Sequence, residues 1–298
     1  MKYIDIHSHL NDAQFDADAV EVMKQMRERD IHTITVGTDL VMSEKAIARA
    51  EELGQWATIG IHPNDNKTQP YEHELYTKLA LHPRTVGIGE CGLDYYRLKE
   101  VSEEERSRQH GLFEAQIRLA AEVDKPLMIH SRSAHNETIA LIRKHQTEFG
   151  SKVRGNIHFF TAGYDIAKQY FDLGFTVSFP GVITFTTEYD ETVRNSPLDM
   201  IMAETDSPYA APIPYRGKRN IPLYVDEIYR KIAELRGADQ EEVRITLNQN
   251  ALRVTLVIPF KAPHLLLRAF GGNSELMSII AIDNYIVFGI FFKTSNTK

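Results

Sequence analysis

Four histidines and two carboxylates lie at or just after the ends of short apolar runs, and these residue types are the ones that bind divalent cations in proteins. The six residues are His7, His9, Glu90, His130, His158 and Asp206. Alternate residues of a strand point to the same side, so the imidazoles of His7 and His9 leave the first run together. The set predicts a site for two divalent cations.

A single histidine of this kind would be weak evidence, because a histidine next to an apolar run is often an ordinary core residue. That explanation suits one histidine, but it does not suit four histidines that all lie at the ends of such runs. Glu90 is the natural bridge, since one carboxylate can give an oxygen to each of two cations. Asp206 can bind a cation and also accept a proton from a metal-bound water whose pKa the cations lower. We therefore expect Glu90 and Asp206 to be catalytic in the hydrolysis of a phosphodiester or a similar ester.

Eight short runs rich in apolar and β-branched residues are spaced along the chain and predict β-strands. They are Tyr3–His7, Thr33–Val36, Ala57–Ile61, Thr85–Gly89, Leu127–His130, Asn156–Phe159, Thr176–Ser178 and Met200–Ala203. Amphipathic segments between them predict helices, among them Val20–Glu28, Glu44–Leu53, Glu104–Val123, Glu137–His145 and Asp165–Phe171. Eight strands with intervening helices favour an α/β fold, a (β/α)₈ TIM barrel with one catalytic domain. In such a barrel the strand ends that carry the six residues meet at one mouth.

An open, doubly wound parallel sheet is the alternative fold for such an alternation. That fold usually carries a Gly-rich loop after its first strand, and none is found here. The barrel is therefore preferred, and no nucleotide cofactor is expected.

The composition is that of an ordinary soluble enzyme. A formal net charge of −7 argues against a broad basic surface for polyanions, but cations in a cleft can reverse the local field, so a nuclease is not excluded. The lone cysteine, Cys91, excludes an internal disulfide framework and fits a reducing cytoplasm. The N-terminus lacks the pattern of a secretory signal. We expect a cytoplasmic protein, and its oligomeric state stays unknown.

The last part of the chain differs in composition from the rest. Only 6 of the 43 residues in 256–298 are charged, against 69 of 255 before them. The apolar stretch Leu276–Phe292 is interrupted by Asp283 and Asn284 and is short for a membrane span. We expect a barrel over residues 1–255, then an apolar extension over 256–298 that docks on protein or is poorly ordered. No membrane association is expected.

A family resemblance makes the prediction more specific. The ordered segments IDIHSHL, GIHPND, IGECGLDYY, MIHSRSA, IHFFTAG and ETDSPY, followed by RGKRN, resemble the motifs of the TatD family of metal-dependent deoxyribonucleases, which are amidohydrolase-like barrels. The resemblance runs from about Met1 to Thr255. It implies a (β/α)₈ fold, one or two divalent cations (zinc, manganese or magnesium) and hydrolysis of ester bonds with DNA as substrate. It also assigns the metal ligands to the six residues named above.

The resemblance places two further residues near the site, His62 in GIHPND and Asp94 in GLDYY. From the residues alone, His62 is interpreted as an exposed loop histidine whose function is open. Arg132 could hold a substrate phosphate with its planar guanidinium or form a salt bridge inside the rim. Two departures from the family pattern, Ser133 and Ile221, lie outside the ligand set and concern substrate preference.

Arg219 lies in a small basic cluster with Arg216 and Lys218, after a proline-rich stretch. The cluster could contact the phosphate backbone of a nucleic acid or be a solvated loop. Its place just past the eighth predicted strand favours the contact.

Three functions are compatible with this set of residues. The preferred one is a deoxyribonuclease that uses a metal-activated water. A hydrolase of small carboxylic esters, lactones or amides would need the same site, because the cations polarise carbonyl and phosphoryl oxygens alike. A non-catalytic metal-binding scaffold is the least favoured, because the ligand set is intact.

Overall fold

The computed structural model describes residues 1–65, 70–96, 101–255, 278–282 and 285–289. The chain divides into two compact units, Met1–Thr255 and Leu256–Lys298. The division falls where the charge content of the sequence changes. Each unit is described by itself.

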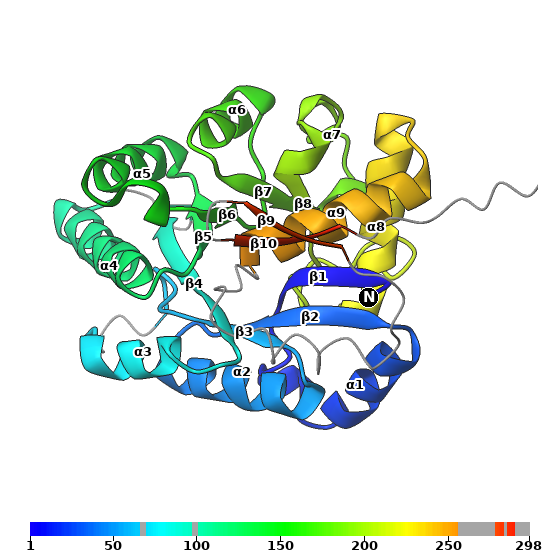
Figure 1. Ribbon diagram of the computed structural model, residues 1–298, viewed down its shortest axis with the longest axis horizontal. Coiled ribbons are helices and arrows are strands. Elements are labelled where there is room, and N and C mark those ends of the chain that lie inside the picture. The colour runs from blue at the N-terminus through cyan, green and yellow to red at the C-terminus, as the bar shows by residue number, and fades with distance from the viewer. Residues whose placement is uncertain (66–69, 97–100, 256–277, 283–284, 290–298) are drawn as a thin grey trace, which may run out of the picture. The chain divides into compact units, whose positions relative to one another are not determined.

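The first unit is built on eight parallel strands whose order in the sheet is their order in the sequence (Figure 1). They are β1 (Tyr3–Ser8), β2 (Ile31–Val36), β3 (Trp56–Ile59), β4 (Thr85–Asp94), β5 (Leu127–Arg132), β6 (Gly155–Ile157), β7 (Thr176–Phe179) and β8 (Ile201–Ala203). Helices surround the sheet in Figure 1, as right-handed crossovers between parallel strands require. The expected (β/α)₈ barrel is confirmed.

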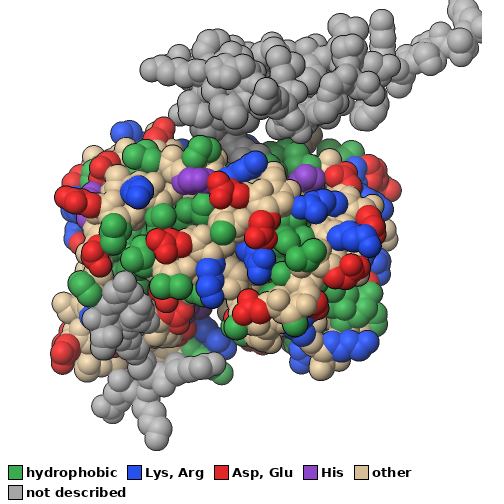
Figure 2. All heavy atoms as spheres, turned by 90° about the horizontal axis from the view of Figure 1, so that it is seen from below, with side chains coloured by type: hydrophobic (Ala, Val, Ile, Leu, Met, Phe, Trp, Pro, Cys, Tyr) green, Lys and Arg blue, Asp and Glu red, His purple; other side chains and the backbone are tan. Residues whose placement is uncertain are grey.

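The helices pack apolar side chains against the outside of the sheet. They are α1 (Ala19–Glu28), α2 (Leu40–Leu53), α3 (His73–Ala80), α4 (Glu103–Glu122), α5 (His135–Phe149), α6 (Tyr164–Asp172), α7 (Asp190–Asn195), α8 (Val225–Arg236) and α9 (Gln240–Thr255). In α8, for example, Ile228 and Ile232 are four residues apart and are fully buried. Side chains on the opposite faces are polar, and Figure 2 shows acidic and basic groups interspersed over one outer face of this unit.

The barrel closes between β1 and the segment that follows β8. The backbone N–H of Asp206 donates to the carbonyl oxygen of His7 at 2.9 Å, and that of His9 donates to the carbonyl oxygen of Ser207 at 2.7 Å. Deeper in the barrel, the buried carboxylate of Asp5 accepts from the backbone N–H of Thr205 at 2.8 Å and from its hydroxyl at 2.6 Å. We call these contacts the closing seam. Three expected metal ligands, His7, His9 and Asp206, take part in the closing seam. Closing the barrel therefore also brings these ligands together.

The fourth strand is longer than its sequence pattern predicted. The expected run ended at Gly89, with Glu90 closing it, whereas β4 continues to Asp94 and Glu90 lies inside the strand. Gly89 and Gly92 have positive φ values of 153° and 135°, and a Cβ on either would collide with a carbonyl oxygen of β5. The two glycines therefore let β4 run close against β5 on both sides of Glu90.

Of the second unit the structure describes one hairpin. In it, β9 (Ser278–Ile282) pairs antiparallel with β10 (Tyr285–Gly289). The rest of the extension expected over 256–298 lies outside the described residues. Within the described part of the chain, no helix has both the length and the apolar character needed to cross a membrane.

The closing seam leads to a stability prediction. Replacing Asp5 by Ala leaves two buried donors of Thr205 without an acceptor, at about 1–3 kcal/mol for each unsatisfied group. Asp5→Asn should lose less, because its amide oxygen can still accept from the N–H of Thr205. The free energy of unfolding in urea, followed by circular dichroism, measures both losses.

The matched control is Asp226→Ala on α8, which removes a surface ion pair with Arg29 (2.9 Å) and should lose about 1 kcal/mol or less. Equal losses for Asp5→Ala and Asp226→Ala would show that Asp5 does not hold the seam.

Candidate metal centre

The strand ends converge on a pocket of about 1310 Å³ whose wall includes five of the six expected ligands, all except His7. His7 is fully buried, and its Nε2 lies within 3.6 Å of three of these wall residues, His9, Glu90 and Asp206. His7 lies within β1 and His9 just beyond it, His130 lies in β5, and His158 directly follows β6. Residues far apart in the chain are thus collected at the mouth of the barrel, where sites in this fold lie.

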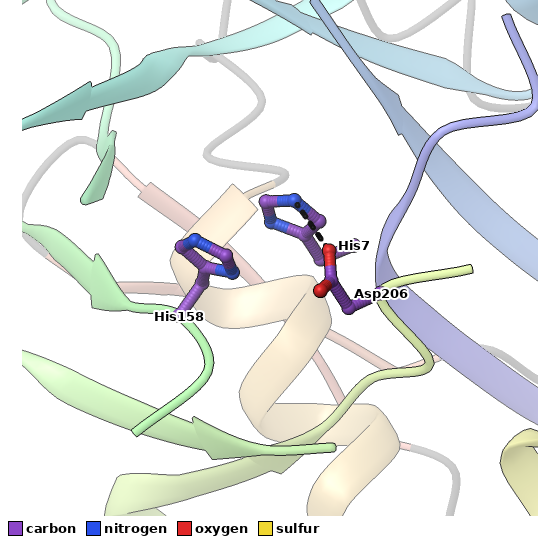
Figure 3. Close-up of side chains that lie close together, drawn as sticks. All are labelled: His7, His158 and Asp206. Atoms are coloured by element: carbon purple, nitrogen blue, oxygen red, sulfur yellow. Dashed lines mark ion pairs between the residues drawn. The ribbon is translucent and has the colours of Figure 1, made fainter. Parts of the chain in front are cut away.

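One group of ligand atoms surrounds the end of β1. The Nε2 atoms of His7 and His9 are 3.1 Å apart. Asp206 Oδ1 lies 3.6 Å from the first of these atoms and 3.3 Å from the second. Oε2 of Glu90 completes the group, at 3.5 Å and 3.7 Å from the same two nitrogens. Figure 3 shows the Asp206 carboxylate turned toward His7.

A second group surrounds the other oxygen of Glu90. Its Oε1 atom lies 2.8 Å from Nε2 of His158, 3.0 Å from Nδ1 of His130 and 3.6 Å from Nε2 of His62. Nδ1 of His130 and Nε2 of His158 are 3.2 Å apart. The interpretation of His62 as an exposed loop histidine is wrong, because its side chain is only 15% exposed and faces Glu90. Glu90 therefore offers one oxygen to each group.

His158 lies between the two groups. Its ring is stacked on that of His7, with centroids 3.9 Å apart and 11° between the planes. Figure 3 shows the two rings next to each other. Among the described residues, three sets of side chains bring ligand atoms within 4.8 Å of one another. These sets are His7, His158 and Asp206; His7, His9 and Glu90; and His62, Glu90 and His130. His158 can therefore serve either group.

The donor atoms fit divalent cations. Two nitrogens that each lie about 2.1 Å from one cation are roughly 3.0–3.4 Å apart at tetrahedral or octahedral angles. The separations of His7 from His9 and of His130 from His158 fall in this range. All the donors are imidazole nitrogens or carboxylate oxygens, the set that zinc and manganese accept. The two groups are therefore candidate sites for two cations bridged by Glu90.

Partners outside the two groups orient the imidazole rings. Nε2 of His130 lies 3.0 Å from Asp94 Oδ2, so its Nδ1 faces Glu90. Nδ1 of His9 lies 3.2 Å from the carbonyl oxygen of Val36. Hydrogen bonds of this kind fix the tautomer and angle of ligand histidines. The structure thus gives Asp94, expected near the site, a definite contact there.

Comparison with known proteins identifies the family of the chain. The family described as TatD related DNase matches residues 4–255. The chain belongs to this family. It is 35% identical over 255 residues to the "Uncharacterized metal-dependent hydrolase YabD" of Bacillus subtilis, covering 84% of this chain and 97% of that protein. The resemblance of the motifs is thereby confirmed.

Two further relatives extend the comparison. The "3'-5' ssDNA/RNA exonuclease TatD" of Klebsiella pneumoniae is 31% identical over 256 residues, covering 83% of this chain and 95% of that protein. The crystal structure of YJJV, a TatD homolog from Escherichia coli, superposes with a TM-score of 0.77 at 22% identity, covering 86% and 99% of the two chains. This last likeness shows the fold. Family membership and the histidine–carboxylate site together assign the chain to the metal-dependent hydrolases of the TatD family.

Glu204 is a residue of this TatD-family site that the sequence did not single out. It is fully buried two positions before Asp206, and its Oε1 lies 3.5 Å from Nδ1 of His158. Its other oxygen accepts from the hydroxyl of Ser178 at 2.6 Å. Its presence in the motif ETDSPY could have indicated that Glu204 lies near the site. The sequence does not indicate which histidine a carboxylate in a strand-like run contacts.

The buried charges compensate one another. Burial alone would raise the pKa of Glu90, but the positive charge of nearby imidazoles, above all His158, holds it well below its ordinary value. Conversely, burial would lower the pKa of His158, but Glu90 and Glu204 raise it well above the ordinary value. Burial and the charge of His158 lower the pKa of His7 to about 3. Without cations, protons on imidazoles therefore balance the carboxylates.

The backbone around Asp206 is strained and firmly held. Asp206 has a φ of 52°, in the left-handed region that non-glycine residues rarely adopt. Asn220, the last residue of the RGKRN segment, is fully buried and donates from its amide to the carbonyl oxygens of Thr205 at 2.8 Å and Tyr209 at 2.6 Å. The role of Asn220 here is to hold the loop that carries Asp206.

The arginines expected near substrate lie in different places. Arg132 lines the pocket, and its guanidinium carbon stands 3.7 Å from the ring centroid of Tyr96. Arg219 is not among the residues that line the pocket. Its guanidinium forms two hydrogen bonds with the carboxylate of Asp18, of 3.0 Å and 2.6 Å. The loop after β8 directs the side chain of Arg219 to Asp18, the residue before α1, and not to the pocket.

The raised imidazole pKa values predict that cation binding releases protons. His9 and His130, like His158, have a raised pKa: burial lowers it, but Asp206 raises it for His9, and Asp94 with Glu90 raises it for His130. A raised pKa keeps the competing proton bound to higher pH, so cation affinity should increase as pH rises through neutrality. Calorimetric titration with Mn²⁺ or Zn²⁺ in buffers of different ionisation enthalpy measures the protons released.

The control is His73→Gln, which replaces a half-exposed histidine on α3 and should leave proton release unchanged. A binding enthalpy that does not depend on the buffer would contradict the prediction.

Proposed function

We propose that the protein is a divalent-cation-dependent deoxyribonuclease that hydrolyses DNA phosphodiester bonds. The observation that carries the proposal is the position of Glu90, whose two oxygens face two separate groups of ligand atoms. Glu90 would hold a cation at each group, and two such cations would stabilise both the attacking and the leaving oxygen in a displacement at phosphorus. The nuclease name of the Klebsiella pneumoniae relative supports the same choice of substrate.

The charge of the pocket explains why cations would be required. Six carboxylates line it, against one arginine and no lysine among the described residues. The carboxylates are those of Asp12, Asp39, Asp65, Glu90, Asp94 and Asp206. Once the imidazoles have lost their protons, this wall would repel a polyanion, and two divalent cations would offset four of the six negative charges. The size of the pocket, about 1310 Å³, exceeds the roughly 300–1,000 Å³ of typical small-molecule sites and leaves room for a nucleic-acid end.

Different side chains would then bind the cations, accept a proton and orient the phosphate. When bound, the cations would polarise a phosphoryl oxygen and lower the pKa of a water molecule. Asp206, at the edge of the first group, would accept the proton of the attacking water. Glu90, kept ionised by the surrounding imidazoles, would hold both cations. Arg132 would orient the phosphate with its planar guanidinium.

Removal of cations or of their bridge should abolish hydrolysis. EDTA, Glu90→Ala or Asp206→Ala should each lower the cleavage of end-labelled single-stranded DNA at least 100-fold, with circular dichroism unchanged. Asp12→Ala is the matched control and should retain activity within about tenfold, since Asp12 lines the pocket but its side chain accepts from Gln14 and Tyr209 and not from a candidate ligand. Full activity of metal-stripped protein would overturn the proposal. Faster turnover of carboxylic esters, lactones or amides than of DNA would favour the small-ester alternative.

The two arginines should differ in their effect on catalysis. Arg132→Ala should raise KM for DNA roughly 10- to 100-fold, since a hydrogen bond to a charged group contributes about 1.5–3 kcal/mol. Arg219→Ala should leave KM unchanged and lower the free energy of unfolding by at least the roughly 1 kcal/mol of a surface ion pair, because it loses Asp18, the carbonyl oxygen of Gln14 and the ring of Phe15 as partners. Steady-state kinetics and urea unfolding separate these effects. An increase of KM in Arg219→Ala equal to that in Arg132→Ala would contradict the assignment.

A further inference from the structure

Two aromatic rings line the pocket beside the candidate ligands. Phe159 follows His158 directly, and the two rings meet edge to face with centroids 6.3 Å apart and 80° between the planes. Tyr209 meets the ring of His9 in the same manner, at 6.1 Å and 68°. Each ring thus stands next to a different candidate ligand, Phe159 next to His158 and Tyr209 next to His9. The proposed chemistry uses neither ring.

Phe159 is held in an unusual conformation. Its φ of 46° lies in the left-handed region, which is rare for a bulky side chain. Its backbone N–H donates to Oε1 of the fully buried Glu204 at 2.6 Å, and this hydrogen bond helps to hold the strained backbone. The ring is partly exposed although it is apolar. A strained aromatic residue kept at a pocket wall is a feature typical of a binding position.

Tyr209 combines an exposed ring with a rigid backbone. Its side chain is 51% exposed. Its backbone N–H donates to the carbonyl oxygen of Asp206 at 2.9 Å, and its own carbonyl oxygen accepts from the buried Asn220 at 2.6 Å. The hydroxyl lies 3.4 Å from Asp12. A ring on so fixed a backbone loses little conformational freedom when a partner packs on it.

We propose that Phe159 and Tyr209 form a stacking subsite for the nucleobase adjacent to the scissile phosphate. The inference rests on the proposed function, since it takes a phosphodiester at the candidate cations as given. Aromatic rings bind any base through its π face, so the subsite would accept all four bases. A base must be free of its duplex neighbours to occupy it, so the nucleotide that enters the pocket must be unstacked.

The binding of a base at this subsite would also favour nucleic acid over phosphodiesters that carry no base. The pocket wall is rich in carboxylates, and stacking needs no charge on the base, so the acidic wall does not oppose it. A substrate with a phosphodiester but no base would lose the stacking contribution while still meeting Arg132 and the cations. The difference between these two substrates therefore isolates the role of the rings.

The test is a double-mutant cycle between the protein and the substrate. The substrates are end-labelled single-stranded oligodeoxynucleotides that are either intact or carry one abasic residue at the terminal or the penultimate position. The variants are Tyr209→Leu and Phe159→Leu, with Phe185→Leu as the matched control. Phe185 is 37% exposed, follows β7 and does not line the pocket.

For wild type, kcat/KM at the adjacent phosphate should fall roughly 5- to 150-fold when the base is removed, the range produced by losing one base–aromatic stack. On the intact substrate, Tyr209→Leu and Phe159→Leu should each lower kcat/KM by a similar factor. On the abasic substrate, the same variants should have nearly the kcat/KM of wild type. Phe185→Leu should keep the wild-type ratio of intact to abasic cleavage. Equal losses on intact and abasic substrates in Tyr209→Leu and Phe159→Leu would overturn the stacking subsite.

A binding measurement makes the result independent of turnover. A 2-aminopurine base next to a phosphorothioate linkage should lose fluorescence when it stacks on wild-type protein or Phe185→Leu, and keep it with Tyr209→Leu. Unquenched fluorescence on wild-type protein that cleaves DNA would overturn the subsite while leaving the nuclease proposal intact. Absence of DNA cleavage by wild-type protein with Mn²⁺ would instead contradict the proposed function.

Discussion

Closure of the barrel between β1 and the segment after β8 is the constraint on which the site depends. Hydrogen bonds join the backbones of His7 and Asp206 and of His9 and Ser207. The same bonds that close the sheet therefore place an imidazole pair opposite a carboxylate. Asp5 continues the seam inward through Thr205. A change that loosens this seam would move candidate ligands and destabilise the barrel at once.

Charge balance is the second constraint. A carboxylate as buried as Glu90 is stable only with positive partners, and the surrounding imidazoles supply them as protons when no cation is bound. Divalent cations can replace those protons, because the donor atoms are already at the separations that a shared cation requires. The barrel thus holds the donor atoms at separations that suit a cation, and under the proposed function bound cations would offset the carboxylates of the pocket wall for an anionic substrate.

The strained backbone at the mouth of the barrel is held by residues that also contact the candidate metal centre. Phe159 and Asp206 both have positive φ values, and each is held by hydrogen bonds to buried or closing residues. Glu204 contacts His158 and also holds the backbone of Phe159, so one buried carboxylate orients a candidate ligand and an aromatic wall. Asn220 has a comparable role for the loop from Thr205 to Tyr209. Hydrogen bonds to buried side chains thus hold both loops at the mouth of the barrel.

Much of this protein follows from its sequence alone. Strand periodicity is local, so eight short runs predicted the eight strands, and residues at their ends predicted that histidines and carboxylates would meet at one mouth. The sequence did not determine that β4 extends through Glu90 to Asp94, because glycine spacing shows its effect only when β5 lies alongside. Nor did it show which oxygen of Glu90 meets which imidazole, that Glu204 contacts His158, or that Arg219 turns to Asp18. These contacts join residues far apart in the chain, and only the closed barrel, which sets the register and direction of every strand, decides them.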